Sequence, residues 1–234
     1  MLKAFTANSK TILSLDFNRD KTCSQICGYC YVENMERIYP SYSAKTLRNY
    51  NWALTDPEGF ANQLNTEYWK LRNSKSEKWK RLNTLPVRIY GSGDYIPGHL
   101  KFLSKLTFKF FIISKTLTLK TMQSQVEQLF KLPNLTSIVF SFDSDNLSNY
   151  TNVKKYFNQD RCKFSYTSMP SEFSDVHTKK SFDIFFNIGN KKVDKEASAT
   201  YKEQCPCDSG MLAHAESCSH CNKCWRSSFT KDKF

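Results

Sequence analysis

The chain has 234 residues, of which 40% are hydrophobic and 15% aromatic, so it is long enough for one large domain with a buried core and a small appendage. The net charge of +12 favours a polyanionic partner such as nucleic acid, although a basic soluble protein from an AT-biased genome has the same composition. No apolar stretch approaches the ~20 residues of a membrane span, and residues 1–10 lack the apolar run of a secretory signal.

The nine cysteines are an odd number, and most of them are grouped two or three residues apart. Such spacing is typical of metal ligands in a reducing compartment, whereas disulfide frameworks pair even numbers of cysteines in oxidising compartments. We therefore expect a cytoplasmic protein that uses its cysteines to bind metal.

Strand-like and helix-like segments alternate along the chain. Six strands are predicted, at residues 11–16, 85–90, 108–113, 135–140, 162–167 and 181–189. Helices are predicted between them at residues 31–38, 57–71, 97–106, 121–132 and 150–157, with Asp56 as the N-cap of the second. This alternation is the pattern of an α/β fold with a parallel sheet.

Some segments and residues carry weaker signals. We expect residues 41–55 to form a loop with a helical turn. Residues 70–81 are strongly basic and should form a solvated helix end or loop, with a phosphate-contacting patch as the alternative. His99 is expected at the surface, and Cys162 is expected in the core as a small hydrophobic residue.

The first cysteine group follows the first predicted strand. Cys23, Cys27 and Cys30 have the spacing C-x3-C-x2-C, with Tyr29 before the last cysteine. Thiolates are soft ligands that suit an iron–sulfur cluster or zinc. Three protein ligands on a four-iron cluster leave one iron open, which a site needs if it is to bind a substrate or cofactor. The alternative is a zinc knuckle that a distant fourth ligand completes.

Polar turns follow four of the other predicted strands. They are Gly91-Ser92-Gly93-Asp94 after the second strand, Ser114-Lys115 after the third, Ser141-Phe142-Asp143 after the fourth and Gly189 at the end of the sixth. Ligands bind at the C-terminal ends of strands in open α/β sheets, so these turns and the cysteine loop should meet at one edge. Ordinary strand-to-helix turns and helix caps are the alternative interpretation.

The second cysteine group lies beyond a polar linker at residues 191–204. It consists of Cys205, Cys207, Cys218, Cys221 and Cys224. The run C-x2-C-x2-C with one upstream cysteine makes a four-thiolate site, which suits zinc or a fully ligated iron–sulfur cluster. One of Cys205 and Cys207 is then spare; we favour Cys207 as the ligand, with His214 and His220 as possible substitutes.

The first motif resembles the signature of the radical S-adenosylmethionine (radical SAM) superfamily. The resemblance implies that Cys23, Cys27 and Cys30 bind a 4Fe–4S cluster whose open iron chelates the amino and carboxyl groups of S-adenosylmethionine. Further cofactor contacts are implied for Tyr29, Gly91, Ser92, Gly93, Asp94, Ser114, Lys115, Ser141, Asp143 and Gly189. Tyr29 would pack near the adenine and Asp94 would bind the amino group, where the superfamily's Gly-Gly-Glu-type motif carries Glu. Ser141 and Asp143 would lie near the ribose and carboxylate, and Gly189 near the adenosine.

From about Leu13 to Trp225 the chain is also similar to a family of phage- and plasmid-encoded radical-SAM-like proteins with a C-terminal cysteine cluster. This similarity implies a partial (β/α)6 barrel over residues 1–190, followed by a linker and a cysteine-rich metal-binding tail over residues 191–234. The tail cluster would be a second 4Fe–4S cluster or zinc.

The implied activity is reductive cleavage of S-adenosylmethionine to a 5′-deoxyadenosyl radical, which abstracts hydrogen from a substrate. The basic charge favours nucleic acid or a nucleotide as that substrate, and a protein such as flavodoxin or ferredoxin is expected as the reductant. The alternatives are a non-enzymatic iron–sulfur or zinc protein that binds nucleic acid, and a radical SAM enzyme that modifies a peptide or protein.

Two separated cysteine groups predict two metal centres. After anaerobic reconstitution, iron and sulfide analysis should approach two four-iron clusters per chain, or one such cluster plus one zinc. A single zinc without iron would contradict the iron–sulfur interpretation of Cys23, Cys27 and Cys30.

Overall fold

The computed structural model describes residues 3–7, 13–24, 27, 30–74, 86–157, 160–168, 182 and 184–187. Several residues predicted above therefore lie outside the described residues. These are Tyr29, Gly189 and the tail cysteines Cys205, Cys207, Cys218, Cys221 and Cys224, together with the linker and residues 75–81 of the basic segment.

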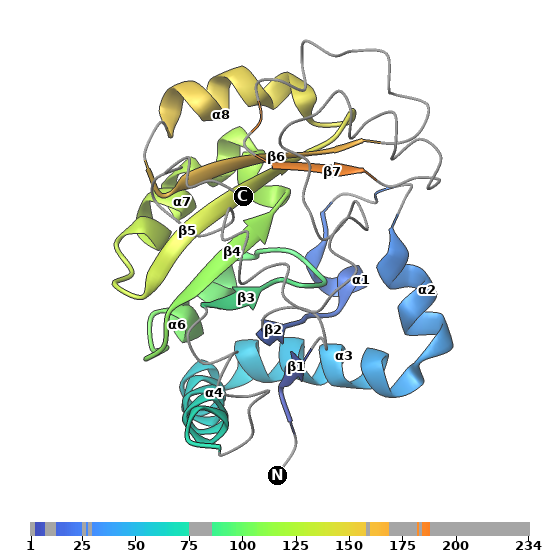
Figure 1. Cartoon of the computed structure of the whole chain (residues 1–234), viewed down its shortest axis with the longest axis vertical. Coiled ribbons are helices and arrows are strands. Elements are labelled where there is room, and N and C mark those ends of the chain that lie inside the picture. The colour runs from blue at the N-terminus through green and yellow to red at the C-terminus, as the bar shows by residue number, and fades with distance from the viewer. Residues whose placement is uncertain are drawn as a thin grey trace, which may run out of the picture.

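The fold is built on one mixed sheet of seven strands that lie side by side in chain order. β1 pairs antiparallel with β2, and each later strand pairs parallel with the one before it (Figure 1). The strands are β1 Phe5–Ala7, β2 Leu13–Leu15, β3 Val87–Ile89, β4 Phe110–Ser114, β5 Leu135–Phe142, β6 Cys162–Ser168 and β7 Ile184–Asn187. All six predicted strands are confirmed, and β1 is an addition. In the described part of the chain β1 and β7 are the outer strands, so the sheet is open.

Helices connect each parallel strand from β2 to β5 with the next one. Between β2 and β3 lie α1 Arg19–Thr22, α2 Tyr31–Ile38, α3 Pro40–Thr55 and α4 Pro57–Arg72; the 3-10 turn η1 Pro97–His99 and α6 Leu100–Leu103 precede β4. The turns η2 Thr116–Thr118 and η3 Lys120–Met122 with α7 Gln123–Phe130 precede β5, and η4 Leu147–Asn149 with α8 Tyr150–Tyr156 precedes β6. No helix in this described part is both long and apolar enough to span a lipid bilayer.

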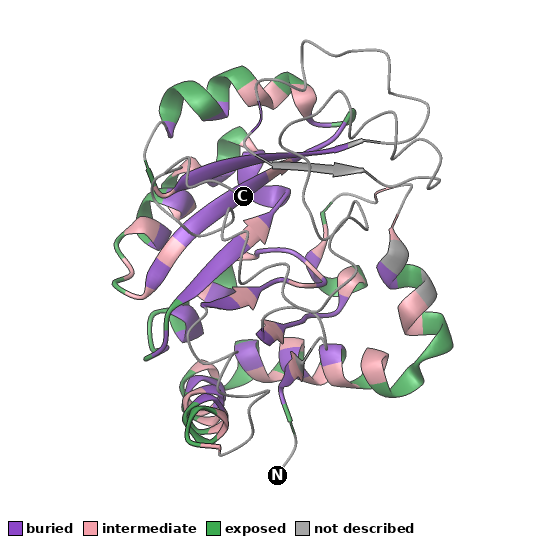
Figure 2. Cartoon of the chain, in the orientation of Figure 1, coloured by how far each residue is buried: buried purple, intermediate pink, exposed green. Residues whose placement is uncertain are grey.

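The core lies between the sheet and the helices that flank it. Alternate strand residues such as Leu15, Ile89, Ile112 and Phe140 have no exposed surface and belong to one apolar cluster. Crossovers between parallel strands are right-handed, so a sheet whose strands follow chain order receives its helices on one face. Figures 1 and 2 show α4, α6, α7 and α8 following one another around the outside of the fanned sheet, with their buried residues turned toward it.

Residues 41–55 form the long helix α3, so the prediction of a loop was wrong. Pro40 stands at the first helical position, where its fixed φ and missing N–H suit a helix start, and the backbone breaks only at Tyr39. The apolar periodicity is hidden because two of the buried residues, Thr46 and Asn49, are polar. The Asn49 amide donates to the carbonyls of Ala4 and Asp16, at 3.1 and 3.0 Å, and so ties the helix to the N-terminal strands.

His99 is fully buried, which corrects the prediction of a surface position. Its ring lies 4.5 Å from the Phe17 ring, measured between centroids, and stacks nearly parallel to Tyr90. His99 Nδ1 lies 2.9 Å from the Tyr90 hydroxyl, whereas Nε2 has no hydrogen-bond partner among the described residues. Burial lowers the pKa of His99 to about 3. Cys162 is buried as predicted.

His99 predicts an acid-sensitive fold. In the unfolded chain it binds a proton below pH 6.5, whereas in the folded chain it binds one only near pH 3. The free energy of unfolding should therefore fall by about 1.4 kcal/mol per pH unit below 6.5, and His99→Phe should remove this component of the slope. Urea titrations at pH 7, 6 and 5 measure it.

The control for this experiment is the double variant His99→Phe/Tyr90→Phe, which also removes the hydroxyl that His99→Phe leaves without a partner. Its pH dependence should match that of His99→Phe. Parallel stability curves for the wild type and both variants would show that His99 titrates normally in the fold.

Candidate functional site

The cysteine loop leaves the C-terminal end of β2 and returns at α2. Asn18 caps α1 by accepting from the Lys21 N–H at 3.2 Å, and Cys23 directly follows this short helix. Cys30 occupies the N-cap position of α2, and its N–H donates to the Cys27 carbonyl at 3.1 Å. The three cysteines are half-buried.

The turn after β3 packs against the beginning of this loop. The N–H of Phe17 donates to the carbonyl of Ser92 at 3.1 Å, and the N–H of Asp94 donates to the Thr22 hydroxyl at 3.0 Å. Glycine is required at the close approaches. A Cβ at Gly91 would lie 2.0 Å from the Ser14 hydroxyl, and Gly93 has a φ of +76° with Thr22 Oγ1 2.6 Å from its missing Cβ.

Tyr90, the residue before this turn, has a left-handed backbone with a φ of +65°. A bulky residue rarely adopts this conformation, and it persists where the surroundings over-determine it. The Tyr90 N–H donates to the Leu15 carbonyl at 3.0 Å, and the buried phenol is bonded to His99. The main-chain and side-chain hydrogen bonds of Tyr90 thus fix the backbone where it leaves β3, immediately before the candidate site.

The Asp94 carboxylate lies buried between the turns that follow β3 and β4. Its Oδ1 accepts from the Ser114 hydroxyl and from the Tyr95 N–H at 2.7 Å. Its Oδ2 accepts from the Lys115 N–H at 3.1 Å and from the N–H and hydroxyl of Thr116, both at 2.9 Å. Burial raises the pKa of Asp94, while the hydrogen bonds oppose that rise.

Both carboxylate oxygens of Asp94 are therefore occupied by donors of the protein. The structure gives Asp94 a positioning role, in which it holds the turn at Ser114, Lys115 and Thr116 in place. None of these contacts of Asp94 corresponds to the predicted contact with the ammonium group of a cofactor. The sequence indicated no role for Thr22, and it indicated Thr116 only as the end of the run Ser114-Lys115-Thr116 that follows the third predicted strand.

The Lys115 ammonium stands between the cysteine loop and the end of β5. Its Nζ forms an ion pair with the Asp143 carboxylate, whose side chain is 2% exposed, and lies 3.6 Å from Asp145 Oδ2. Lys115 Nζ also donates toward Cys27 Sγ at 3.7 Å. Burial alone would lower the pKa of Lys115, but the Asp143 hydrogen bond and the negative charges of Cys27, Asp143 and Asp145 outweigh it and raise that pKa.

The end of β5 is braced by Asn146. Its side-chain oxygen accepts from the Asp143 N–H at 2.8 Å, and its amide nitrogen donates to the Ser141 carbonyl at 3.0 Å. Ser141 and Asp143 thus lie at the same edge of the sheet as Lys115, as predicted from their positions after the strand. The Ser24 hydroxyl, in the cysteine loop, lies 3.1 Å from the Thr116 hydroxyl and closes the ring of contacts.

The Cys23 thiol resists deprotonation in the protein alone. Burial, followed by the negative charges of Asp94, Cys30 and Cys27, raises the pKa of the Cys23 thiol to about 12. A cation bound among the thiols would relieve this repulsion, so the donor chemistry fits a metal centre. Within the described ranges, no three His, Cys, Asp or Glu side chains already converge as a metal site.

The sheet face opposite the core carries charged and hydroxyl side chains among apolar ones such as Phe111 and Val139. Arg88 and Lys163 alternate with core residues in β3 and β6, as do Ser137 in β5 and Ser165 in β6. Lys163 is 5% exposed. Arg88 reaches the Gly91 carbonyl at the strand end, and its Nε is buried with no partner among the described residues. Neither of these cations was singled out from the sequence.

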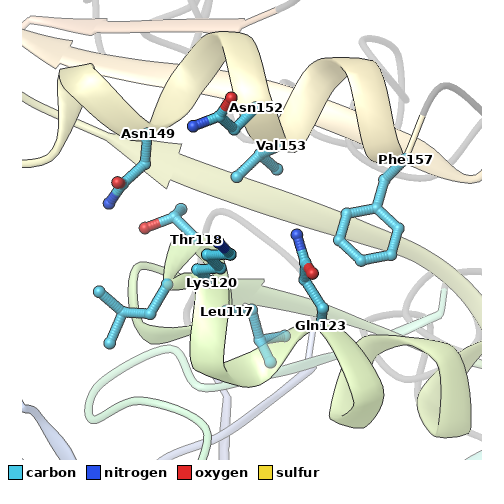
Figure 3. A pocket seen from close by; sticks show the side chains of 9 residues that line it. Leu117, Thr118, Lys120, Gln123, Asn149, Asn152, Val153 and Phe157 are labelled. Atoms are coloured by element: carbon cyan, nitrogen blue, oxygen red, sulfur yellow. The ribbon is translucent and has the colours of Figure 1, made fainter.

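A separate cavity of about 20 Å³ lies on the helix side of the sheet, between the η2–η3 segment and α8. Figure 3 shows Leu117, Val153 and Phe157 as its apolar lining, together with the amide side chains of Gln123 and Asn149. Its volume corresponds to about one water molecule. It contains none of the predicted site residues and is too small for a substrate.

Comparison with known proteins gives one family. The family model described as gene product 88 matches residues 2–227, which is nearly the whole chain. That description names no activity. No curated protein and no solved structure matches the chain.

Asp94→Asn is expected to destabilise the fold. An amide in this place must point a donor at N–H groups that now donate to a carboxylate, so at least about 2 kcal/mol of stability should be lost. Denaturant unfolding measures the loss. Asp145→Asn is the matched control, because that carboxylate is 64% exposed and its ion pair should contribute less than about 1 kcal/mol. Equal effects of both substitutions would contradict the positioning role of Asp94.

Proposed function

The chain belongs to the gene product 88 family, and we propose that it is a radical SAM enzyme. In this proposal Cys23, Cys27 and Cys30 bind a 4Fe–4S cluster, and the turns after β3, β4 and β5 bind S-adenosylmethionine beside it. The sheet is then a partial (β/α)6 barrel whose inner face receives the substrate, and residues 191–234 carry a second cluster or zinc.

One observation carries the proposal: the C-x3-C-x2-C loop makes contacts with the strand ends that the motif requires as neighbours. Thr22 is bonded to Asp94, Ser24 to Thr116 and Cys27 to Lys115. These contacts join the loop after β2 to the turns after β3 and β4, and Lys115 extends them to Asp143 after β5. In a parallel sheet this edge is where ligands bind.

When bound, the iron–sulfur cluster supplies the electron that cleaves S-adenosylmethionine to methionine and a 5′-deoxyadenosyl radical. The residues of the chain have the other tasks. The three cysteines provide the thiolates, and Asp94 keeps Ser114, Lys115 and Thr116 in register with the loop. Asp143 holds the Lys115 ammonium at the end of β5, and the Ser141 hydroxyl would serve as donor or acceptor for a ribose hydroxyl there.

The substrate proposed for this site is a nucleic acid or a nucleotide. The sheet face opposite the core carries the Arg88 guanidinium, whose buried Nε has no partner in the described part of the chain, and Lys163, which is 5% exposed. Guanidinium and ammonium groups with hydroxyls are the donors that recognise phosphates. The net charge of +12 favours the same class of ligand.

The test is anaerobic turnover. The reconstituted chain, reduced with dithionite, should convert S-adenosylmethionine to 5′-deoxyadenosine and methionine, which liquid chromatography with mass detection quantifies. A protein that binds iron and sulfide but releases no 5′-deoxyadenosine under these conditions would favour the non-enzymatic alternative.

Cys27→Ala should reduce 5′-deoxyadenosine formation at least a hundredfold and remove the iron bound by the N-terminal group, because two thiolates do not hold a site-differentiated four-iron cluster. Cys162→Ala is the matched control, since Cys162 is a buried thiol in β6 within the apolar core. It should retain wild-type iron content and turnover. If Cys27→Ala kept its cofactor cleavage, the assignment of this cysteine as a ligand would be wrong.

A further inference from the structure

The contact between Lys115 and Cys27 has a consequence for the metal centre beyond cofactor binding. We infer that Lys115, held by Asp143, is the positive charge that sets the reduction potential of the metal centre at Cys23, Cys27 and Cys30. This inference rests on the proposed function for the presence of that centre. It assigns Lys115 to the cysteine sulfur, in addition to the cofactor contact that the resemblance implies.

Lys115 Nζ lies 3.7 Å from Cys27 Sγ, and the Lys115 side chain is only 9% exposed. A charge in that position is poorly screened by water and salt. Reduction potentials of iron–sulfur clusters depend on net charge, on hydrogen bonds to the sulfurs and on solvent exposure, and this one ammonium contributes to all three.

Two buried carboxylates hold Lys115 in place. The Lys115 N–H is bonded to Asp94 and the side chain is paired with Asp143, so both ends of the residue are fixed. Asp143 is itself braced by the Asn146 side chain at 2.8 Å. A lysine stem is flexible, and a fixed ammonium at a sulfur needs this support.

Other charged side chains lie near the cysteines and Lys115. The Arg19 guanidinium is the other nearby cation, but it is paired with Asp20 and Glu33 and is 19% exposed. The negative charge of Asp94 raises the pKa of Cys23, while Asp143 and Asp145 form ion pairs with Lys115. Among these charges Lys115 combines burial with direct contact to a ligand sulfur, and Asp143 is its main opposing charge.

Opposite signs are expected for the two members of the ion pair. Lys115→Met removes a positive charge beside the sulfur, so reduction should become roughly tenfold less favourable, or ~59 mV more negative for one electron. Asp143→Asn removes a negative charge and retains an oxygen acceptor for Lys115, so its potential should move in the less negative direction. Lys115→Arg keeps the charge and should stay near the wild type.

The experiment is an anaerobic dithionite titration of the reconstituted full-length chain, followed by electron paramagnetic resonance. The signal of the N-terminal centre is the one that Cys27→Ala lacks. Lys120→Met is the matched control, because Lys120 is an exposed lysine in the next turn. Its potential should equal that of the wild type.

Equal midpoint potentials for Lys115→Met and Lys120→Met would overturn the inference, as would shifts of the same sign for Lys115→Met and Asp143→Asn. If Lys115→Met fails to assemble the centre, Asp143→Asn decides alone: a potential that is unchanged or more negative overturns it. A wild-type chain that binds iron while the variants do not shift contradicts only the role of Lys115. A wild-type chain without iron contradicts the proposed function and the inference together.

Discussion

The buried carboxylate of Asp94 is the constraint on which the candidate site depends. It accepts hydrogen bonds from Ser114, Lys115, Thr116 and Tyr95, and its own N–H is bonded to Thr22. A buried carboxylate is tolerated only when its charge is met by donors. Because those donors come from consecutive turns of the sheet edge, meeting the charge of Asp94 fixes the turn after β4 against the turn after β3 and the cysteine loop.

The order of the strands explains why so many residues of the candidate site lie at this edge. β2 to β6 follow one another in chain order and in parallel, so each new strand delivers its C-terminal turn to the same edge beside the previous one. The flanking helices then take one face, where the apolar cluster lies. The opposite face carries Arg88 and Lys163, which are not part of the apolar cluster. The apolar cluster therefore occupies one face of the sheet, while the candidate site lies at the strand ends.

Electrostatic balance couples the residues at the edge to one another. Burial and the negative charges of Asp94, Cys30 and Cys27 raise the pKa of the Cys23 thiol, while Lys115 lies against Cys27 with Asp143 as its counter-charge. Taking any one of these charges out of water is costly unless another compensates it. The site is thus a set of mutually dependent charges in which a bound cation would be stabilised by the thiols and adjusted by Lys115.

Much of the fold follows from the sequence alone, because strand runs, Asp56 with Pro57 and the strand-end turns are local signals of backbone conformation. The cysteine spacing is equally local, and it identifies the loop as a candidate metal site without any structure. Only the tertiary structure decided the rest. It showed α3, whose buried Thr46 and Asn49 hide the apolar pattern, and it placed His99 in the core, where aromatic packing outweighs the usual preference of histidine for water. It also assigned Asp94 to hold the neighbouring turn and placed Lys115 beside Cys27, 88 positions apart in the chain. Contacts of that kind depend on how parallel strands bring distant turns together, which no local pattern specifies.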